Sequence, residues 1–217
     1  MVITSEMFEA YLKCPAKCWL QFLGEDGKGN IYSEWVRNKK GAYLTRGIKR
    51  LIDGVQNVEY IIAPSSPMNL KAASWKLAFD FPARSKELGS CLHAVERISS
   101  ECRGKPVRFI PIRFIISSKL TKADKLMIAF DAITLAETTK REISHGKIIH
   151  GDGYSTQKVK TCALTGEVRK IAGKIACLMA NNSPLTSLLT GIALNANINA
   201  GAVKKPWKKT TSACLPE

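Results

Sequence analysis

Residues 92–150 read LHAVERISSECRGKPVRFIPIRFIISSKLTKADKLMIAFDAITLAETTKREISHGKIIH, and this stretch decides the fold. Leu92–Ile98 and Val107–Ile116 are rich in Val, Ile and Phe and are bounded by Gly, Ser and Pro, which predicts two strands. From Ala123 to Glu142 apolar residues recur at helical spacing, which predicts an amphipathic helix. Ile143–Ile149 returns to the strand pattern. The order strand, strand, helix, strand predicts the centre of an α/β domain whose sheet is covered by helices.

The flanking segments predict further elements of the same domain. Thr4 or Ser5 can cap a first helix. Cys14-Pro15 interrupts that helix, because proline lacks the backbone N–H that the helix needs. The remaining predicted elements are a helix at Ile31–Val55, strands at Val58–Ala63 and Trp75–Phe81, a strand at Tyr154–Thr161 that forms a hairpin with Ile143–Ile149, and a helix at Leu164–Met179.

Length and charge limit the class of protein. The chain has 217 residues, of which 45% are hydrophobic, so it can form a buried core. We expect one domain over residues 1–190 and an irregular basic tail over residues 191–217. The formal net charge of +15 favours polyanionic partners: DNA, RNA or an anionic membrane surface. The alternative is a basic enzyme with no nucleic-acid role.

The N-terminus and the cysteines indicate a cellular location. No apolar run approaches the roughly 18 residues that span a bilayer. Glu6 and Glu9 stand where a signal peptide would carry lysines, and no apolar segment follows them. We therefore expect a cytoplasmic protein without a membrane partner. Seven cysteines is an odd number. In a reducing compartment, cysteines are expected to be small buried side chains, not disulfides.

The segment 14–20, Cys-Pro-Ala-Lys-Cys-Trp-Leu, carries a family resemblance. It resembles the Cys-Pro-x-Lys-x-Trp-Leu opening of the RecB-like branch of the PD-(D/E)XK nucleases, which includes the iron–sulfur exonucleases associated with CRISPR systems. The order of the central elements resembles the same branch. More closely still, the run resembles the N-terminal module of a group of RecB-family nucleases whose longer chains continue into an RNase H-like domain. Over about residues 3–190 this resemblance implies a PD-(D/E)XK restriction-endonuclease-like core, with a mixed sheet flanked by helices, in a truncated module.

The resemblance also implies a metal site, which this chain has largely lost. Such nucleases hold Mg²⁺ or Mn²⁺ with carboxylates, and a lysine assists the attacking water. In the family's Pro-x-Glu-x-Lys pattern, Arg113 stands at the glutamate and Ile115 at the lysine. Glu96 falls at the acidic position of the preceding strand. We expect the sheet to place Glu96 beside Arg113, in a degenerate site of uncertain activity.

A second alignment takes Asp80 as the first acid and Glu96 as the second, with Ile98 in place of the lysine. The candidate catalytic residues are therefore Glu96 and Asp80. Glu96 also has a simpler interpretation, as a strand-edge glutamate paired with Arg97 or Arg113.

Related nucleases close their domain with three cysteines that join the N-terminal cysteine around a [4Fe–4S] cluster. The resemblance makes Cys14 a candidate ligand, but the three partners are missing, so we expect the cluster to be absent. A shift of reading frame from Gly191 onward, with permitted codons, would yield Cys-x2-Cys-x5-Cys, and the nucleotide sequence tests this hypothesis. The alternatives are a genuine basic tail, and Cys14 and Cys18 as two core residues.

Five basic side chains are the candidate nucleic-acid contacts: Lys13, Lys17, Arg46, Lys49 and Arg113. A solvated helix face is the alternative. Two functions follow as hypotheses. The first is a RecB-like DNA-processing nuclease module, with Mg²⁺ or Mn²⁺ if it is active. The second is a non-catalytic domain that binds nucleic acid and positions DNA for a partner nuclease, a helicase or an RNase H-like domain.

Overall fold

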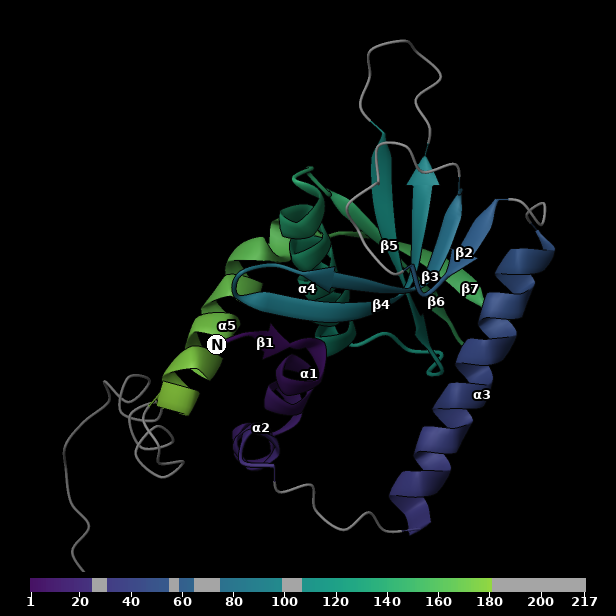
Figure 1. Cartoon of the computed structure of the whole chain (residues 1–217). Helices are drawn as coiled ribbons and strands as arrows, with labels where there is room; N and C mark the ends of the chain where they lie inside the picture. The colour runs from purple at the N-terminus through teal and green to yellow at the C-terminus, as the bar shows by residue number, and fades with distance from the viewer. Residues whose placement is uncertain (25–30, 55–58, 65–74, 99–106, 181–217) are drawn as a thin grey trace, which may run out of the picture.

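The chain folds around one mixed sheet with helices on both faces (Figure 1). The computed structural model describes residues 1–24, 31–54, 59–64, 75–98 and 107–180. The predicted tail over residues 191–217 lies outside these ranges. The expected α/β class is confirmed.

Within the described residues, seven strands form the sheet. They are β1 (Ile3–Thr4), β2 (Tyr60–Ile62), β3 (Leu77–Arg84), β4 (Leu88–Ile98), β5 (Arg108–Ile115), β6 (His145–His150) and β7 (Ser155–Lys160). Their order is β2-β3-β4-β5-β6-β7, and β1 pairs with β4. The β2–β3, β5–β6 and β1–β4 pairs are parallel, and the others are antiparallel. The predicted hairpin of β6 with β7 is confirmed.

In the part of the chain that the structure describes, five α-helices form the layers on either side of the sheet. They are α1 (Ser5–Lys13), α2 (Pro15–Phe22), α3 (Ile31–Asp53), α4 (Lys122–Thr139) and α5 (Thr165–Ala180). One face of the sheet packs against α3, and the other packs against α4. Helices α1, α2 and α5 pack together on the outer side of α4 (Figure 1). No helix in the described ranges is both long and apolar enough to span a bilayer.

Local sequence explains where the helices begin. The Thr4 hydroxyl caps α1 by accepting a hydrogen bond from the backbone N–H of Met7. Pro15 occupies the first turn of α2, where its missing N–H costs nothing. A capping box starts α4: the Asp124 N–H donates to the Thr121 hydroxyl, and the Thr121 N–H donates to the Asp124 carboxylate.

Helix α4 differs from the prediction. Its residues 126–135 are all buried, because the sheet covers one side and α1, α2 and α5 cover the other. The prediction of a helix is therefore confirmed, but the prediction that it is amphipathic is wrong. A helix buried on all sides is apolar all round. Asp131 is the one charged residue within this buried segment.

Strands β3 and β4 bend at Asp80. This residue has φ +47, a left-handed conformation that is rare outside glycine. Phe79 and Phe81 lie on either side of it and belong to different core clusters. Residues two apart in a regular strand share a face, so the strand twists sharply here. The bend lies opposite His93 in the β3–β4 register.

Helix α3 approaches the sheet through Gly47, and this contact gives a first prediction. A Cβ at Gly47 would lie 2.5 Å from the Cε1 atom of Phe114, whereas a Cβ at Gly41 would meet no atom within 4 Å. Gly47→Ala should therefore lower the free energy of unfolding by about 1–3 kcal/mol through overpacking. Gly41→Ala should raise it by up to about 1 kcal/mol through helix propensity. Denaturant unfolding of both variants measures this, and equal effects would contradict the close approach.

Candidate functional site

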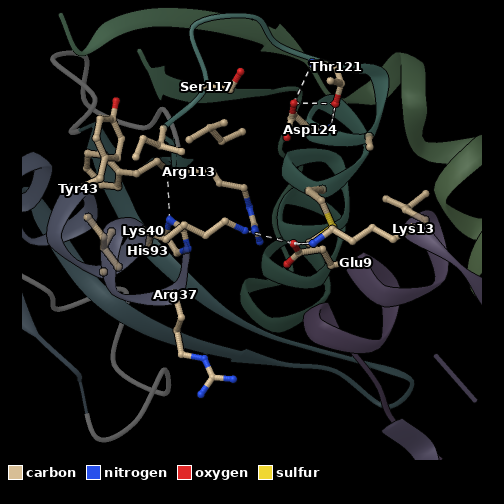
Figure 2. A pocket seen from close by; sticks show the side chains of 18 residues that line it. Glu9, Lys13, Arg37, Lys40, Tyr43, His93, Arg113, Ser117, Thr121 and Asp124 are labelled. Carbon is tan, nitrogen blue, oxygen red and sulfur yellow. Dashed lines mark hydrogen bonds and ion pairs between the residues drawn. The ribbon is translucent and has the colours of Figure 1, made fainter. Parts of the chain in front are cut away.

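A pocket of about 620 Å³ opens where three helices meet the end of β5. Its lining comes from α1 (Glu9, Leu12, Lys13), α3 (Arg37, Lys40, Gly41, Tyr43, Leu44), β4 (His93), β5 and the loop after it (Arg113, Phe114, Ile115, Ile116, Ser117), and α4 with its cap (Thr121, Ala123, Asp124, Met127). Figure 2 shows basic side chains from α1, α3 and β5 gathered on one side of this space.

The floor of the pocket is an ion pair between the sheet and α4. Arg113 Nε donates to Asp131 Oδ2 at 2.8 Å, and its Nη2 donates to Oδ1 at 2.9 Å. Ser90 on β4 donates its hydroxyl to the same Oδ1 at 2.7 Å. The Asp131 side chain is 2% exposed and that of Arg113 is 11% exposed. The bidentate geometry and the hydroxyl satisfy a carboxylate that is otherwise costly to bury.

The surroundings of Arg113 keep its guanidinium group protonated. Burial alone would lower the pKa of Arg113, but the charge and hydrogen bonds of Asp131, with the charges of Glu9 and Glu6, raise it above its ordinary value. The guanidinium therefore stays protonated. Its charge is balanced by the carboxylate of Asp131, and it stands at the position where the family resemblance expects a metal-binding glutamate.

His93 lies next to Arg113 across the β4–β5 pair, because Ala94 pairs with Ile112 in this register. Its Nδ1 accepts a hydrogen bond from the backbone N–H of Phe114 at 3.1 Å. Burial, followed by the charge of Arg113, lowers the pKa of His93 to about 4. At neutral pH the ring is therefore uncharged. Because Nδ1 is an acceptor, the proton resides on Nε2, which is a donor.

Basic side chains from two helices surround Glu9. Lys13 Nζ lies 2.5 Å from Glu9 Oε1, and Lys40 Nζ lies 3.8 Å from the same atom. Burial alone would raise the pKa of Glu9, but these lysines and Arg113 lower it below its ordinary value. In the part of the chain that the structure describes, no acidic side chain pairs with Arg37, which points outward from the pocket in Figure 2.

Tyr43 anchors the pocket wall beside α3 through two contacts. The Tyr43 hydroxyl donates to the carbonyl of Gly151 at 2.8 Å. The Tyr43 ring stacks on Tyr154 with centroids 4.6 Å apart and planes 3° apart. These contacts join α3, the helix that carries Lys40 and Arg37, to the turn between β6 and β7.

The structure does not bring the two predicted catalytic acids into this pocket. Glu96 pairs with Lys147 of β6. Glu96 lies opposite Ile110, an odd number of residues from Arg113, so the two side chains point to opposite faces of the sheet. The expectation that Glu96 lies beside Arg113 is therefore wrong, and His93 occupies that place. Asp80 is exposed at the bend in β3 and is not among the lining residues.

The predicted nucleic-acid contacts are divided between two surfaces. Lys13 and Arg113 line the pocket. Lys17, Arg46 and Lys49 are exposed on α2 and α3, outside the pocket. Sequence reasoning missed Arg37, Lys40 and His93 as pocket residues. The basic positions on α3 were visible in the sequence, but which of them face the pocket depends on how α3 packs on the sheet.

The residues present do not fit the metal groups that the resemblance implies. At the expected carboxylate position a divalent ion would meet the protonated guanidinium of Arg113, which already holds Asp131. Among the described residues no group of three or more His, Cys, Asp or Glu side chains could hold a metal ion. Cys14 is exposed, and the proposed frameshifted cysteines lie outside the described residues. Burial raises the pKa of Cys18 to about 11, so its thiol is protonated.

Taken together, the pocket offers the buried Arg113–Asp131 pair, a neutral imidazole donor, two lysines beside Glu9, and Arg37, on a largely apolar wall. Guanidinium, ammonium and N–H donors are the groups that proteins use to bind phosphate oxygens. The arrangement is therefore suited to holding an anion. Neither a protein-family model nor a curated protein matches this chain.

Proposed function

We propose that this chain is a non-catalytic nucleic-acid-binding module with a PD-(D/E)XK-like core, which positions DNA for a partner nuclease or helicase. The order of a helix, three strands, a helix and a strand in α1, β3, β4, β5, α4 and β6 supports this kinship. So do the mixed sheet and the Cys-Pro-x-Lys-x-Trp-Leu opening. His93, and not Glu96, would then stand at the position of the family's first acid.

One observation carries the proposal: the Arg113–Asp131 pair at the pocket floor. A site that cleaves phosphodiesters with a metal concentrates carboxylates. Here the same part of the sheet carries the guanidinium of Arg113, which is ion-paired with the buried carboxylate of Asp131. The pocket lining carries four basic side chains and two acidic ones, an excess of positive charge that favours a phosphate over a divalent metal ion.

The rim and the net charge of +15 support binding of a polyanion. Lys13, Lys40 and Arg37 are side chains that contact phosphates without reading the sequence of bases. Such binding releases counterions from the nucleic acid, so it weakens steeply as salt is added.

We expect Arg37→Gln/Lys40→Gln to weaken DNA binding and to reduce the slope of log K against log salt by about 1.5, close to the value for two lost phosphate contacts. Lys170→Gln/Lys174→Gln removes the same charge from the exposed face of α5 and should leave the slope unchanged. Titration of labelled linear DNA at several salt concentrations measures both. Equal slopes for the two double variants would mean that the pocket does not bind the strand.

The second candidate is the metal-dependent nuclease itself. Glu96 and Asp80 are the acids that the resemblance aligns with catalysis, and Glu96 is half-buried beside Lys147. Linear single-stranded and double-stranded DNA should remain intact with this chain and Mn²⁺. Cleavage that Glu96→Ala or Asp80→Ala abolishes would contradict the non-catalytic proposal and support the nuclease.

A further inference from the structure

Helix α3 carries a second surface, away from the pocket. Tyr32, Trp35, Lys39, Arg46 and Lys49 recur at spacings of three, four, seven and three residues, so they lie along one side of the helix. We call these five residues the aromatic–basic stripe. All five are exposed. The stripe spans about 26 Å along the helix axis.

Other residues of α3 pack the helix against the sheet. Tyr43 and Gly47 are its buried positions and contact the sheet side. The first half of α3 extends past the sheet along one side of the molecule (Figure 1). The stripe is therefore a separate surface, and the packing of α3 on the sheet does not require its aromatic side chains.

The aromatic end of the stripe is already organised. The rings of Tyr32 and Trp35 stack with centroids 6.0 Å apart and planes 25° apart. The two residues remain 70% and 54% exposed. Lys39 Nζ lies 4.9 Å from the centre of the Trp35 ring. A stacked pair of exposed rings beside a cation provides an aromatic platform next to a charge that can meet a phosphate.

We propose that the aromatic–basic stripe binds single-stranded nucleic acid, with bases stacking on Tyr32 and Trp35 and phosphates contacting Lys39, Arg46 and Lys49. This inference rests on the proposed function and names its substrate as a single strand. In a duplex the base faces are stacked on one another, so the two rings reach them only in an unpaired strand.

Charge favours this occupant over a second copy of the chain. Helix α3 contains six Lys or Arg residues and two Asp or Glu residues, giving it a net charge of +4 (6 − 2). Two such helices side by side would repel one another, because like charges oppose association. A polyanion gains from the same charges.

The probe for the test is a fluorescein-labelled oligothymidine of about 15 nucleotides, and the readout is fluorescence anisotropy. Trp35→Ala should weaken binding by about 5- to 100-fold, the loss typical of one stacked base, and Trp35→Phe should retain most of the affinity. Ile31→Ala is the matched control: this residue is 88% exposed on the same helix but has no ring, and its replacement should change binding less than about twofold. The unlabelled duplex of the same length should compete more weakly than the single strand.

The outcomes separate this inference from the proposed function. If Trp35→Ala binds the oligonucleotide as tightly as the unaltered chain, while Arg37→Gln/Lys40→Gln weakens binding, the stripe proposal is wrong and the proposed function stands. If the unaltered chain binds neither the single strand nor the duplex, both are wrong. If Ile31→Ala and Trp35→Ala weaken binding equally, and the chain dimerises through this helix, the stripe is a self-association surface and the inference is overturned.

Discussion

Replacing Asp131 by alanine should lower the free energy of unfolding by about 3–5 kcal/mol, the usual cost of leaving one member of a buried ion pair without its partner. Arg113 would lose both of its hydrogen bonds to the carboxylate, and Ser90 would lose its acceptor. The Arg113 side chain is 11% exposed, so water could replace the lost partner only in part. Denaturant unfolding near neutral pH measures the change.

Two further variants test the cause of that loss. Ser90→Ala removes one hydroxyl and leaves the ion pair in place, so it should cost only about 1 kcal/mol. Arg113→Met/Asp131→Leu replaces both charges by apolar side chains and should cost less than Asp131→Ala alone, since no charge is left unpaired. If Asp131→Ala cost less than about 1 kcal/mol, the pair would not be the fixed floor of the pocket.

The order of strands and helices follows from local patterns that the sequence displays. Runs rich in Val, Ile and Phe between turn residues locate β4 and β5, and the Thr121–Asp124 spacing marks the start of α4. Strand β4 begins at Leu88, four residues earlier than predicted, because its first residues pair with β1 and the end of β3. The helical spacing of apolar residues also does not predict that α4 is buried on every side, since this depends on which helices pack outside it.

The composition of the candidate site depends on the β4–β5 register, which the strand patterns alone do not reveal. The family pattern places Arg113 correctly on β5 but suggests Glu96 as its neighbour. The β4–β5 hairpin sets residue 93 opposite residue 113, and a shift of three residues moves a side chain to the other face of the sheet. Glu96 therefore meets Lys147, and a histidine enters the pocket in its place.

The sequence itself marks Asp131 as a residue that needs a partner. It is the single charged residue in the apolar run Leu126–Leu135. A carboxylate in such a run must find a partner when the helix is buried, because an unpaired buried charge is too costly. Arg113 is likewise the single charged residue in the apolar segment Phe109–Ile116, and its charge is opposite to that of Asp131. The two isolated charges could have been paired before the fold was known.

Lowering the pH from about 7.5 to about 5 should decrease the free energy of unfolding by about 2 kcal/mol, because the ring of His93 stays neutral in the folded chain. Its pKa is about 4 in the folded chain, against 6.5 for an ordinary histidine. As the pH falls below 6.5, the unfolded chain takes up a proton that the folded chain does not, so the free energy of unfolding decreases until the pH reaches about 4. The cause is burial together with the nearby charges of Arg113 and Lys40, which outweigh the opposing effects of Asp131 and Glu9.

The control for this effect is His93→Asn, whose side-chain oxygen can accept the Phe114 N–H in place of Nδ1 but does not titrate. Glu9 also loses stabilisation in acid, because its pKa lies below its ordinary value, and this contribution is present in both proteins. The difference in unfolding free energy between the two should therefore shift by about 2 kcal/mol over the same pH interval, in favour of the variant at low pH. Parallel pH profiles would show that His93 is protonated without penalty in the folded chain. The buried cation Arg113 opposes protonation of His93. The pH profile therefore tests the electrostatics of the pocket independently of any ligand.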